Sequence, residues 1–208
     1  GTQELPEILN TTPGVWATKD GGGCGDAKIN MRGFQSANVA VLVNGIPIND
    51  MEGGWVYWSN WAGLSDVASN IQTQRGLGAA ILSAPSIGGT INITTSSLDA
   101  EKGGSVWYGM GNDGMNNYGV KLSTGLMDNG WAVTVLGSRK FGDGYIQGTD
   151  FSGYNYFVNV SKRINDRHQL SFTAFGAPQT HNKRGNKYGL SIINYQRYAK
   201  NWMGTESP

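Results

Sequence analysis

Four aromatic side chains gather in the glycine-containing stretch of residues 49–61, NDMEGGWVYWSNW. Aromatic rings on an exposed loop can stack on sugar rings or on the flat face of a metal chelate. The alternative is that they pack against one another or against a neighbouring wall, as large aromatic side chains usually do. The stretch is therefore a candidate ligand-contacting loop, with these candidate residues: Asn49, Trp55, Tyr57, Trp58 and Trp61.

A second candidate loop spans Lys19 to Ala27 and is dominated by glycine. It carries Cys24 and Asp26, and both join the candidate ligand-contacting set. Because Cys24 is the single cysteine, it forms no disulfide within the chain. Its glycine neighbours favour an ordinary loop residue, and a reactive or ligand-touching thiol is the alternative.

The residue patterns of catalytic and cofactor sites are incomplete in this chain. Residues 76–81, GLGAAI, begin like a dinucleotide-binding loop, but the third glycine and the strand–helix–strand context are missing. His168 and His181 do not stand at metal-ligand spacing from each other or from acids, and Ser83 and Ser86 lack a nucleophile-elbow context. We therefore expect a protein that is not an enzyme, with no metal site and no cofactor.

Composition narrows the class of protein further. Glycine accounts for 32 of 208 residues, and there are seven Trp, nine Tyr and six Phe, which favours a β protein rich in turns and close approaches. The net charge of +1 gives no electrostatic argument for a nucleic-acid partner. No apolar run reaches the ~18 residues of a membrane-spanning helix. That leaves spanning by β-strands open, because barrel strands give only a weak sequence signal.

The first part of the chain, residues 1–97, has the pattern of a mixed α+β domain. A short helix is expected to start at Glu4–Leu9, where Pro6 and acidic residues occupy the first turn. Strands are expected at Lys28–Gly33 and at Val39–Val43, the second ending in an Asn-Gly turn. A helical turn is expected within Leu64–Ile71.

The end of this first part, Ile71–Thr95, places an arginine ahead of a glycine pair and a strand of alternating pattern. Gly88 and Gly89 stand where another backbone or wall would pass too close for a side chain. Arg75 needs an anionic partner, since an unpaired buried charge is costly. We expect that partner to lie outside this domain.

From about Gly103 onward, five runs alternate between apolar and polar residues, which is typical of strands with one apolar face. The apolar positions are Val106, Tyr108, Met110; Tyr118, Val120, Leu122; Trp131, Val133, Val135; Tyr154, Tyr156, Val158, Val160; and Leu170, Phe172, Ala174. Tight turns at 128–130 and 165–167 contrast with a long polar loop at 141–153 and a longer segment after Gly176. Such unequal connections favour an outer-membrane barrel, although a soluble β-sandwich also alternates. Five strands cannot close a barrel, so we expect a piece of a larger protein.

Four blocks in order resemble the plug domain of TonB-dependent outer-membrane receptors, and the alternating half resembles the first strands of their barrel. The blocks are Leu5–Leu9 with Pro13–Val15, Ile29–Phe34, Val41–Pro47, and Arg75–Gly76 through Gly88–Ile93. The resemblance implies an α+β plug domain, residues 1–97, followed by antiparallel β-strands of an incomplete transmembrane β-barrel, residues 98–208. It also implies the bacterial outer membrane as location.

The same resemblance implies an energised importer. The ligand would bind on the extracellular side, and the protein TonB would act through an N-terminal segment absent here. Arg32 and Arg75 match plug arginines that pair with glutamates of the inner barrel wall, and those glutamates would lie in later strands. Gln72 stands where the family usually has a glutamate, which makes one member of this plug–barrel coupling cluster neutral.

The implied partners are outer-membrane lipid and a small ligand such as an iron chelate, cobalamin or an oligosaccharide. The segment 77–87 resembles the general receptor pattern rather than that of dedicated glycan importers. The alternative function, from a different class, is a soluble β-rich glycan-binding module that uses the tryptophan loop.

Overall fold

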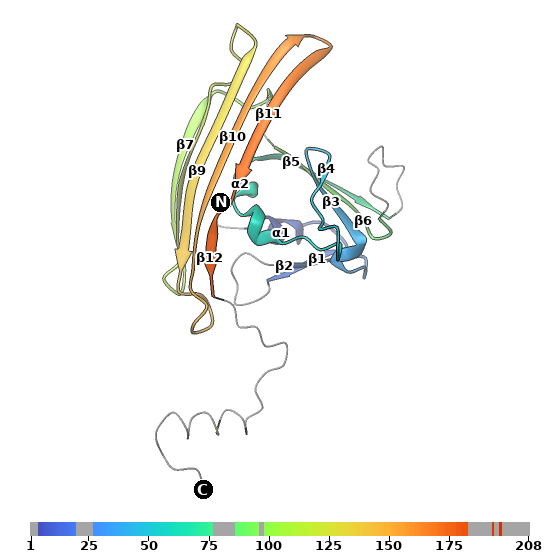
Figure 1. The fold of residues 1–208 in the computed structure, drawn as a ribbon, viewed down its shortest axis with the longest axis vertical. Coiled ribbons are helices and arrows are strands. Elements are labelled where there is room, and N and C mark those ends of the chain that lie inside the picture. Colours follow the sequence, from blue (N-terminus) through green and yellow to red (C-terminus); the bar gives the residue numbers. More distant parts are fainter. Residues whose placement is uncertain are drawn as a thin grey trace.

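The computed structural model describes residues 4–19, 27–76, 86–95, 98–182, 193 and 196. Its elements fall into two groups, and Figure 1 shows the first group lying on one side of a long sheet formed by the second. Within the described residues no helix is both long and apolar enough to cross a membrane.

The first group holds two small sheets and two short helices. Strands β1 (Val15–Lys19) and β2 (Ala27–Met31) form an antiparallel pair. A four-stranded sheet has the order β4-β3-β6-β5, from Ile46–Pro47, Val39–Val43, Gly89–Thr95 and Ala68–Arg75. The helices are α1 (Leu5–Leu9) and α2 (Leu64–Val67), and the 3₁₀ turns are η1 (Ser36–Asn38) and η2 (Trp58–Trp61).

Local sequence explains several of these boundaries. Helix α1 begins where expected, because the Glu7 side chain accepts the backbone N–H of Glu4 at 2.9 Å in a capping box. The turn after β3 has left-handed conformations at Asn44 (φ 51°) and Gly45 (φ 81°), as its Asn-Gly sequence predicts. Strand β2 ends two residues earlier than expected, because Arg32 (φ 53°) and Gly33 (φ 82°) form a turn.

Two other expectations are corrected. The helical turn expected over Leu64–Ile71 ends at Val67, and β5 begins at Ala68. The polar loop expected at 141–153 shortens to 143–150, since β9 (Trp131–Gly142) and β10 (Phe151–Asn165) extend into both of its ends. Pairing explains both extensions, because the backbone N–H and C=O groups of residues 141–142 and 151–153 find partners on the adjacent strands.

The second group is a sheet of order β11-β10-β9-β8-β7, with β12 (Gln179–His181) also paired to β10. The remaining strands are β7 (Gly103–Met110), β8 (Asn116–Ser123) and β11 (His168–Gly176), and all pairings are antiparallel. The registers Tyr108↔Tyr118, Tyr118↔Arg139 and Tyr154↔Arg139 place the predicted apolar positions on one face, since directly opposed residues share a face. This face is largely exposed, with Val106 82%, Tyr154 52% and Phe172 66% accessible.

The opposite face of the sheet packs on the first group. Leu136 and Phe157, exposed by 4% and 0%, belong to the same buried cluster as Leu5, Ile29 and Ile91. Trp107 and Phe175 pack against this cluster from the same face. The apolar core is therefore shared between the plug-like group and the concave wall. The division predicted at residue 97 falls between the end of β6 at Thr95 and the start of β7 at Gly103.

Gly88 and Gly89, at the start of β6, allow neighbouring backbone to lie very close to the strand, as their sequence predicted. A Cβ on Gly89, which has φ +132°, would lie 2.4 Å from the carbonyl oxygen of Gln74 and 2.5 Å from the Met31 sulfur. One on Gly88 would lie 2.7 Å from the Asn38 oxygen. All three distances are shorter than real Cβ contacts, so β6 can lie against its neighbours only with glycine at these positions.

Candidate functional site

The loop after β4 is a rigid turn fixed by two polar side chains. Asn49 accepts the N–H of Val41 at 2.8 Å and donates to the oxygens of Val39 (3.0 Å) and Gly54 (2.8 Å). Asp50 Oδ1 accepts the N–H groups of Gly53 (2.5 Å) and Gly54 (2.9 Å). The Asn49 amide is thus fully used within the protein. These bonds hold the loop on β3, and the ligand contact predicted for Asn49 stays a prediction.

The aromatic residues of this loop divide into two pairs. Trp58 is 3% exposed and belongs to the core cluster, while Trp61 stacks on Phe175 of β11 with ring centroids 5.7 Å apart. Both therefore pack within the protein, and a ligand contact by either stays a prediction. Trp55 and Tyr57 are 39% and 56% exposed, and they are the more accessible members of the set.

A cavity of about 610 Å³ lies between this loop, the β3–β4 hairpin and β11. Its walls include Ile46, Tyr57, Asn60, Trp61 and Phe175, so most of the lining is apolar with a few polar groups. Binding pockets for small ligands usually have this size and character. Because β11 is at the edge of its sheet, the next strand of a complete barrel would border the same cavity.

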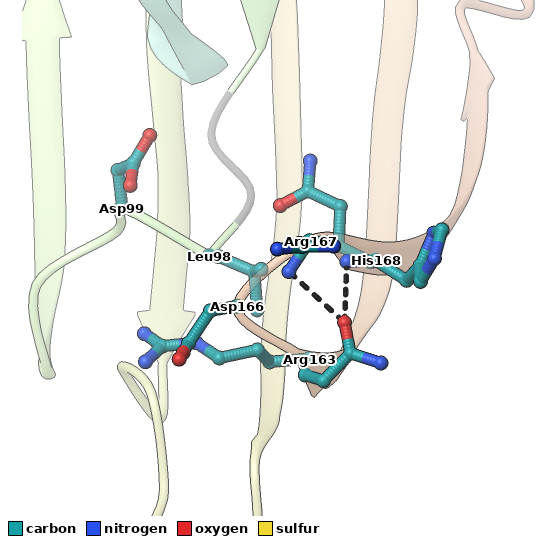
Figure 2. Close-up of a pocket in the computed structure, with 8 residues that line it drawn as sticks. Leu98, Asp99, Arg163, Asp166, Arg167 and His168 are labelled. Carbon is teal, nitrogen blue, oxygen red and sulfur yellow. Dashed lines mark hydrogen bonds between the residues drawn. The ribbon is translucent and has the colours of Figure 1, made fainter.

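A second, more polar hollow of about 300 Å³ lies at the turn between β10 and β11 (Figure 2). Here Asn165 Oδ1 accepts the N–H groups of Arg167 and His168, each at 2.9 Å. Figure 2 shows Asp99 and Leu98, from the connection that enters β7, on its other side. Residues 163–169 are all exposed, His168 included, and the hydrogen bonds explain the turn without any ligand.

Polar contacts join the plug-like group to three strands of the wall. Lys140 of β9 forms a close ion pair with Glu4, whose side chain is 20% exposed. Lys121 of β8 donates to the backbone oxygen of Asp66 at 3.1 Å. Asn155 of β10, with its amide oriented to satisfy both neighbours, donates to the Ala62 oxygen at 2.9 Å and accepts from Ser138 at 3.0 Å. These contacts, none of them expected from sequence, surround α1 and the start of α2.

Two carboxyl groups at this boundary have shifted pKa values. Burial raises the pKa of Asp66. Burial also disfavours the charged form of Glu7, but the bond to Lys19 at 2.9 Å, the N–H of Glu4 and the charge of Lys140 outweigh it and lower the pKa of Glu7. The charged form of Glu7 is therefore part of the folded state.

The predicted coupling residues lie elsewhere on the plug. Arg32 is exposed, and a Cβ on Gly76 would lie 3.1 Å from its Nη1, which places the guanidinium beside the end of β5 where Arg75 stands. Among the described residues Arg32 forms no ion pair, and nothing is described of the Arg75 side chain. Gln72 is exposed and pairs with Asn92 across β5 and β6. Their pairing with glutamates of later strands stays a prediction.

The glycine loop with Cys24 and Asp26 lies outside the described residues, so its predicted role is untested. Within the described part of the chain, no three His, Cys, Asp or Glu side chains cluster as metal ligands.

Sequence comparison finds relatives for almost the whole chain. The family described as "TonB-dependent Receptor Plug Domain" matches residues 1–90. The vitamin B12 transporter BtuB of Vibrio vulnificus is 26% identical over 198 residues, which is 91% of this chain and 32% of that protein. The corresponding transporter of Photobacterium profundum is 29% identical, over 83% of this chain and 29% of its own length. The chain thus spans about a third of these relatives.

Solved structures show the same fold. The copper transporter OprC superposes with a TM-score of 0.70 at 14% identity, covering 89% of this chain and 30% of its own. The pyoverdine outer-membrane receptor FpvA of Pseudomonas aeruginosa superposes with a TM-score of 0.66 at 16% identity, covering 82% and 24%. The plug-domain match, the open antiparallel wall and its exposed apolar face are all expected of an outer-membrane receptor. Together they disfavour the soluble β-rich module. Residues 1–90 therefore match the plug domain of TonB-dependent receptors, and the strands that follow have the fold of part of the solved receptors on which the chain superposes.

Proposed function

We propose that the complete protein is an energised importer that captures a scarce, ring-bearing ligand on its extracellular side. The curated relatives are vitamin B12 transporters, and FpvA was solved with the iron chelator pyoverdine. Cobalamin is therefore the first ligand to test and a ferric siderophore the second. We also infer that the protein takes no part in catalysis, and that it engages TonB through a segment outside this chain.

The observation that carries this proposal is the exposed pair Trp55 and Tyr57 on a loop fixed by Asn49. A rigid aromatic pair loses little conformational freedom on binding, so stacking on a corrin ring or a chelate face is favourable. Tyr57 also lines the cavity beside β11, which connects the loop to a space of ligand size. Cys24 and Asp26 remain candidate contacts for the same ligand.

The test uses the full-length receptor in detergent and titrates it with cyanocobalamin, a panel of ferric siderophores and an oligosaccharide panel. Trp55→Ala and Tyr57→Ala are each expected to weaken binding of one ligand class by about tenfold, since one aromatic contact contributes roughly 1–2 kcal/mol. Trp16→Ala is the matched control, because Trp16 is 66% exposed on β1 and outside the loop. Unchanged affinity in both loop variants, with a ligand that binds, would refute the role of the pair.

Transport itself needs a separate measurement. A strain deleted for the receptor gene should regain growth on the bound ligand with the wild-type gene, and only when TonB is present. Growth that does not depend on TonB would contradict energised import while leaving the binding result intact.

A further inference from the structure

Arg139 is a cation on the lipid-facing side of the wall. It lies on β9 directly opposite Tyr118 of β8 and Tyr154 of β10, and directly opposed residues share a face. That face is the exposed apolar one. Val135, which lies four residues before Arg139 on the same strand and on the same face, is also exposed. A charged side chain facing lipid is rare, and its energetic cost depends on depth.

The position of Arg139 along β9 places it near the level of the lipid headgroups. It stands three residues before the end of β9, in a group of rings made by Tyr118, Phe141 and Tyr154. Its guanidinium carbon lies 4.9 Å from the centre of the Phe141 ring and 5.0 Å from that of Tyr154. Rings of aromatic residues mark the membrane–water boundary of barrels.

This boundary is the outer one. The connection 143–150 lies at the same end of the sheet, whereas the two-residue turn 166–167 joins β10 to β11 at the opposite end. Outer-membrane barrels have their longer loops outside the cell and their shortest turns in the periplasm. Arg139 therefore faces the outer leaflet.

The guanidinium has hydrogen-bonding capacity that the protein does not use. Its Nε is buried without a hydrogen-bond partner, and among the described residues Arg139 forms no ion pair. Both flanking strands are present beside it, so further barrel strands, which would lie beyond β7 and β11, do not change its immediate neighbours. The two aromatic rings orient the cation but offer no acceptor in its plane.

Lys162 provides a comparison within the same face. It lies at the opposite end of the wall, paired with Trp131, and its ammonium is 5.0 Å from the centre of that ring. Unlike Arg139, it also donates a hydrogen bond to the backbone oxygen of Asn129. A cation at this end of the face thus finds its acceptor within the protein.

We propose that Arg139, held between Phe141 and Tyr154, binds the phosphate group of an outer-leaflet lipid. The two terminal nitrogens of the planar guanidinium can donate parallel hydrogen bonds to two phosphate oxygens, whereas the buried Nε is out of a lipid's reach, and a headgroup phosphate supplies the missing negative charge at this depth. The site depends on the membrane location of the wall and not on the imported ligand, so it can fail or hold independently of the proposed transport function.

The test reconstitutes the full-length receptor in phosphatidylcholine nanodiscs that contain a minor fraction of lipid A, a glycolipid with phosphate monoesters, or of its dephosphorylated form. Native mass spectrometry then counts the glycolipid retained by the wild type, Arg139→Gln and the control Lys162→Gln. Wild type and Lys162→Gln should retain lipid A, and Arg139→Gln should retain it about tenfold less, as expected for one charge-assisted pair. The dephosphorylated form should be retained weakly by all three.

Equal retention of lipid A by wild type and Arg139→Gln would overturn the proposal. So would wild-type retention of the dephosphorylated form that is as strong as its retention of lipid A. Complete displacement of lipid A by millimolar inorganic phosphate would show a free-anion site instead of a lipid site. Heat-dependent mobility in gels checks that each variant is folded. If Arg139→Gln does not fold, Arg139→Lys decides, because it keeps the charge but loses the planar fork and should show intermediate retention.

Discussion

At the scale of single residues, the plug is joined to its wall by few polar contacts. Glu4 meets Lys140, the backbone of Asp66 accepts from Lys121, and Asn155 reaches the oxygen of Ala62. Gly63 permits the last approach, because a Cβ there would lie 2.9 Å from the Asn155 side chain and its φ is +78°. These few polar contacts fix the position of the plug against the wall, while much of the boundary between plug and wall is apolar.

The Glu4–Lys140 pair makes a prediction about local stability. Lys140→Met leaves the half-buried Glu4 carboxylate without its wall partner, so local opening of α1 should become easier by about 1–3 kcal/mol. The measurement is amide hydrogen exchange of α1 in the full-length receptor. The double variant Glu4→Gln/Lys140→Met should cost less than the two single changes added together. If the effects of the two single changes simply add up in the double variant, the pair contributes nothing. Lys162→Met, on the lipid face, serves as the control.

Glu7 predicts a pH dependence. Its pKa in the folded state is below the ordinary value of 4.5, so the charged form stabilises the plug. This contribution is complete above the unfolded value and is lost as pH falls through the lower, folded value. Near-ultraviolet circular dichroism of the receptor during thermal unfolding, repeated from pH 6 to pH 3, should show a falling midpoint at the acid end. Glu7→Gln should flatten that fall, and an unchanged acid slope in the variant would contradict the assignment.

At the scale of secondary structure, alternation predicted the wall strands and their lipid-facing sides, because each position there meets either lipid or the plug. The strand β5 was missed, since Ser69, Gln72 and Gln74 give it a polar surface that resembles a loop. The inner-face residues Leu136 and Phe157 were missed for a related reason. Polar neighbours such as Thr134 and Asn159 mark that face as hydrophilic, and only tertiary packing shows which positions touch the plug.

The sequence could identify the candidate loop but not which of its aromatic side chains are buried. The sequence 49–61 identifies an aromatic loop, yet nothing in it separates Trp58, buried in the core, from the exposed Tyr57. The difference arises from η2, which turns Trp58 inward and Trp61 toward Phe175. Likewise the three backbone partners of Asn49 could not be predicted from the sequence, because they depend on how the loop folds back on β3.

The junction of β5 and β6 carries the prediction at this scale. Gly89→Ala puts a Cβ against the Gln74 oxygen at a positive φ, so it should destabilise the plug by about 2 kcal/mol or more. Gly137→Ala is the matched control, since nothing lies within 4 Å of its added Cβ, and it should change stability by less than about 0.5 kcal/mol. Hydrogen exchange of β5 and β6 measures both. Equal effects of the two substitutions would contradict the close-approach argument.

At the scale of the whole molecule, the plug covers only the concave side of an open wall. The wall's convex face presents side chains such as Tyr108, Leu122 and Phe172, which lipid would cover in the membrane. Strands β7 and β11 lie at the two ends of the sheet order, so among the residues that the structure describes each leaves one row of backbone groups unpaired. Unpaired edges and an apolar face together favour association between chains.

The final prediction concerns residues 1–208 produced alone. Without detergent they should associate, because the edges of β7 and β11 can pair between chains and the lipid-facing band has no other cover. Analytical ultracentrifugation should find polydisperse species in buffer and smaller ones in detergent, while the full-length receptor in detergent, whose barrel has no free edges, should sediment as one species. A monodisperse monomer with a cooperative melting transition in buffer would instead restore the soluble β-rich module. In that case the exposed band would have to be covered by the chain itself, and the apolar alternation of β7 to β11 would no longer indicate lipid.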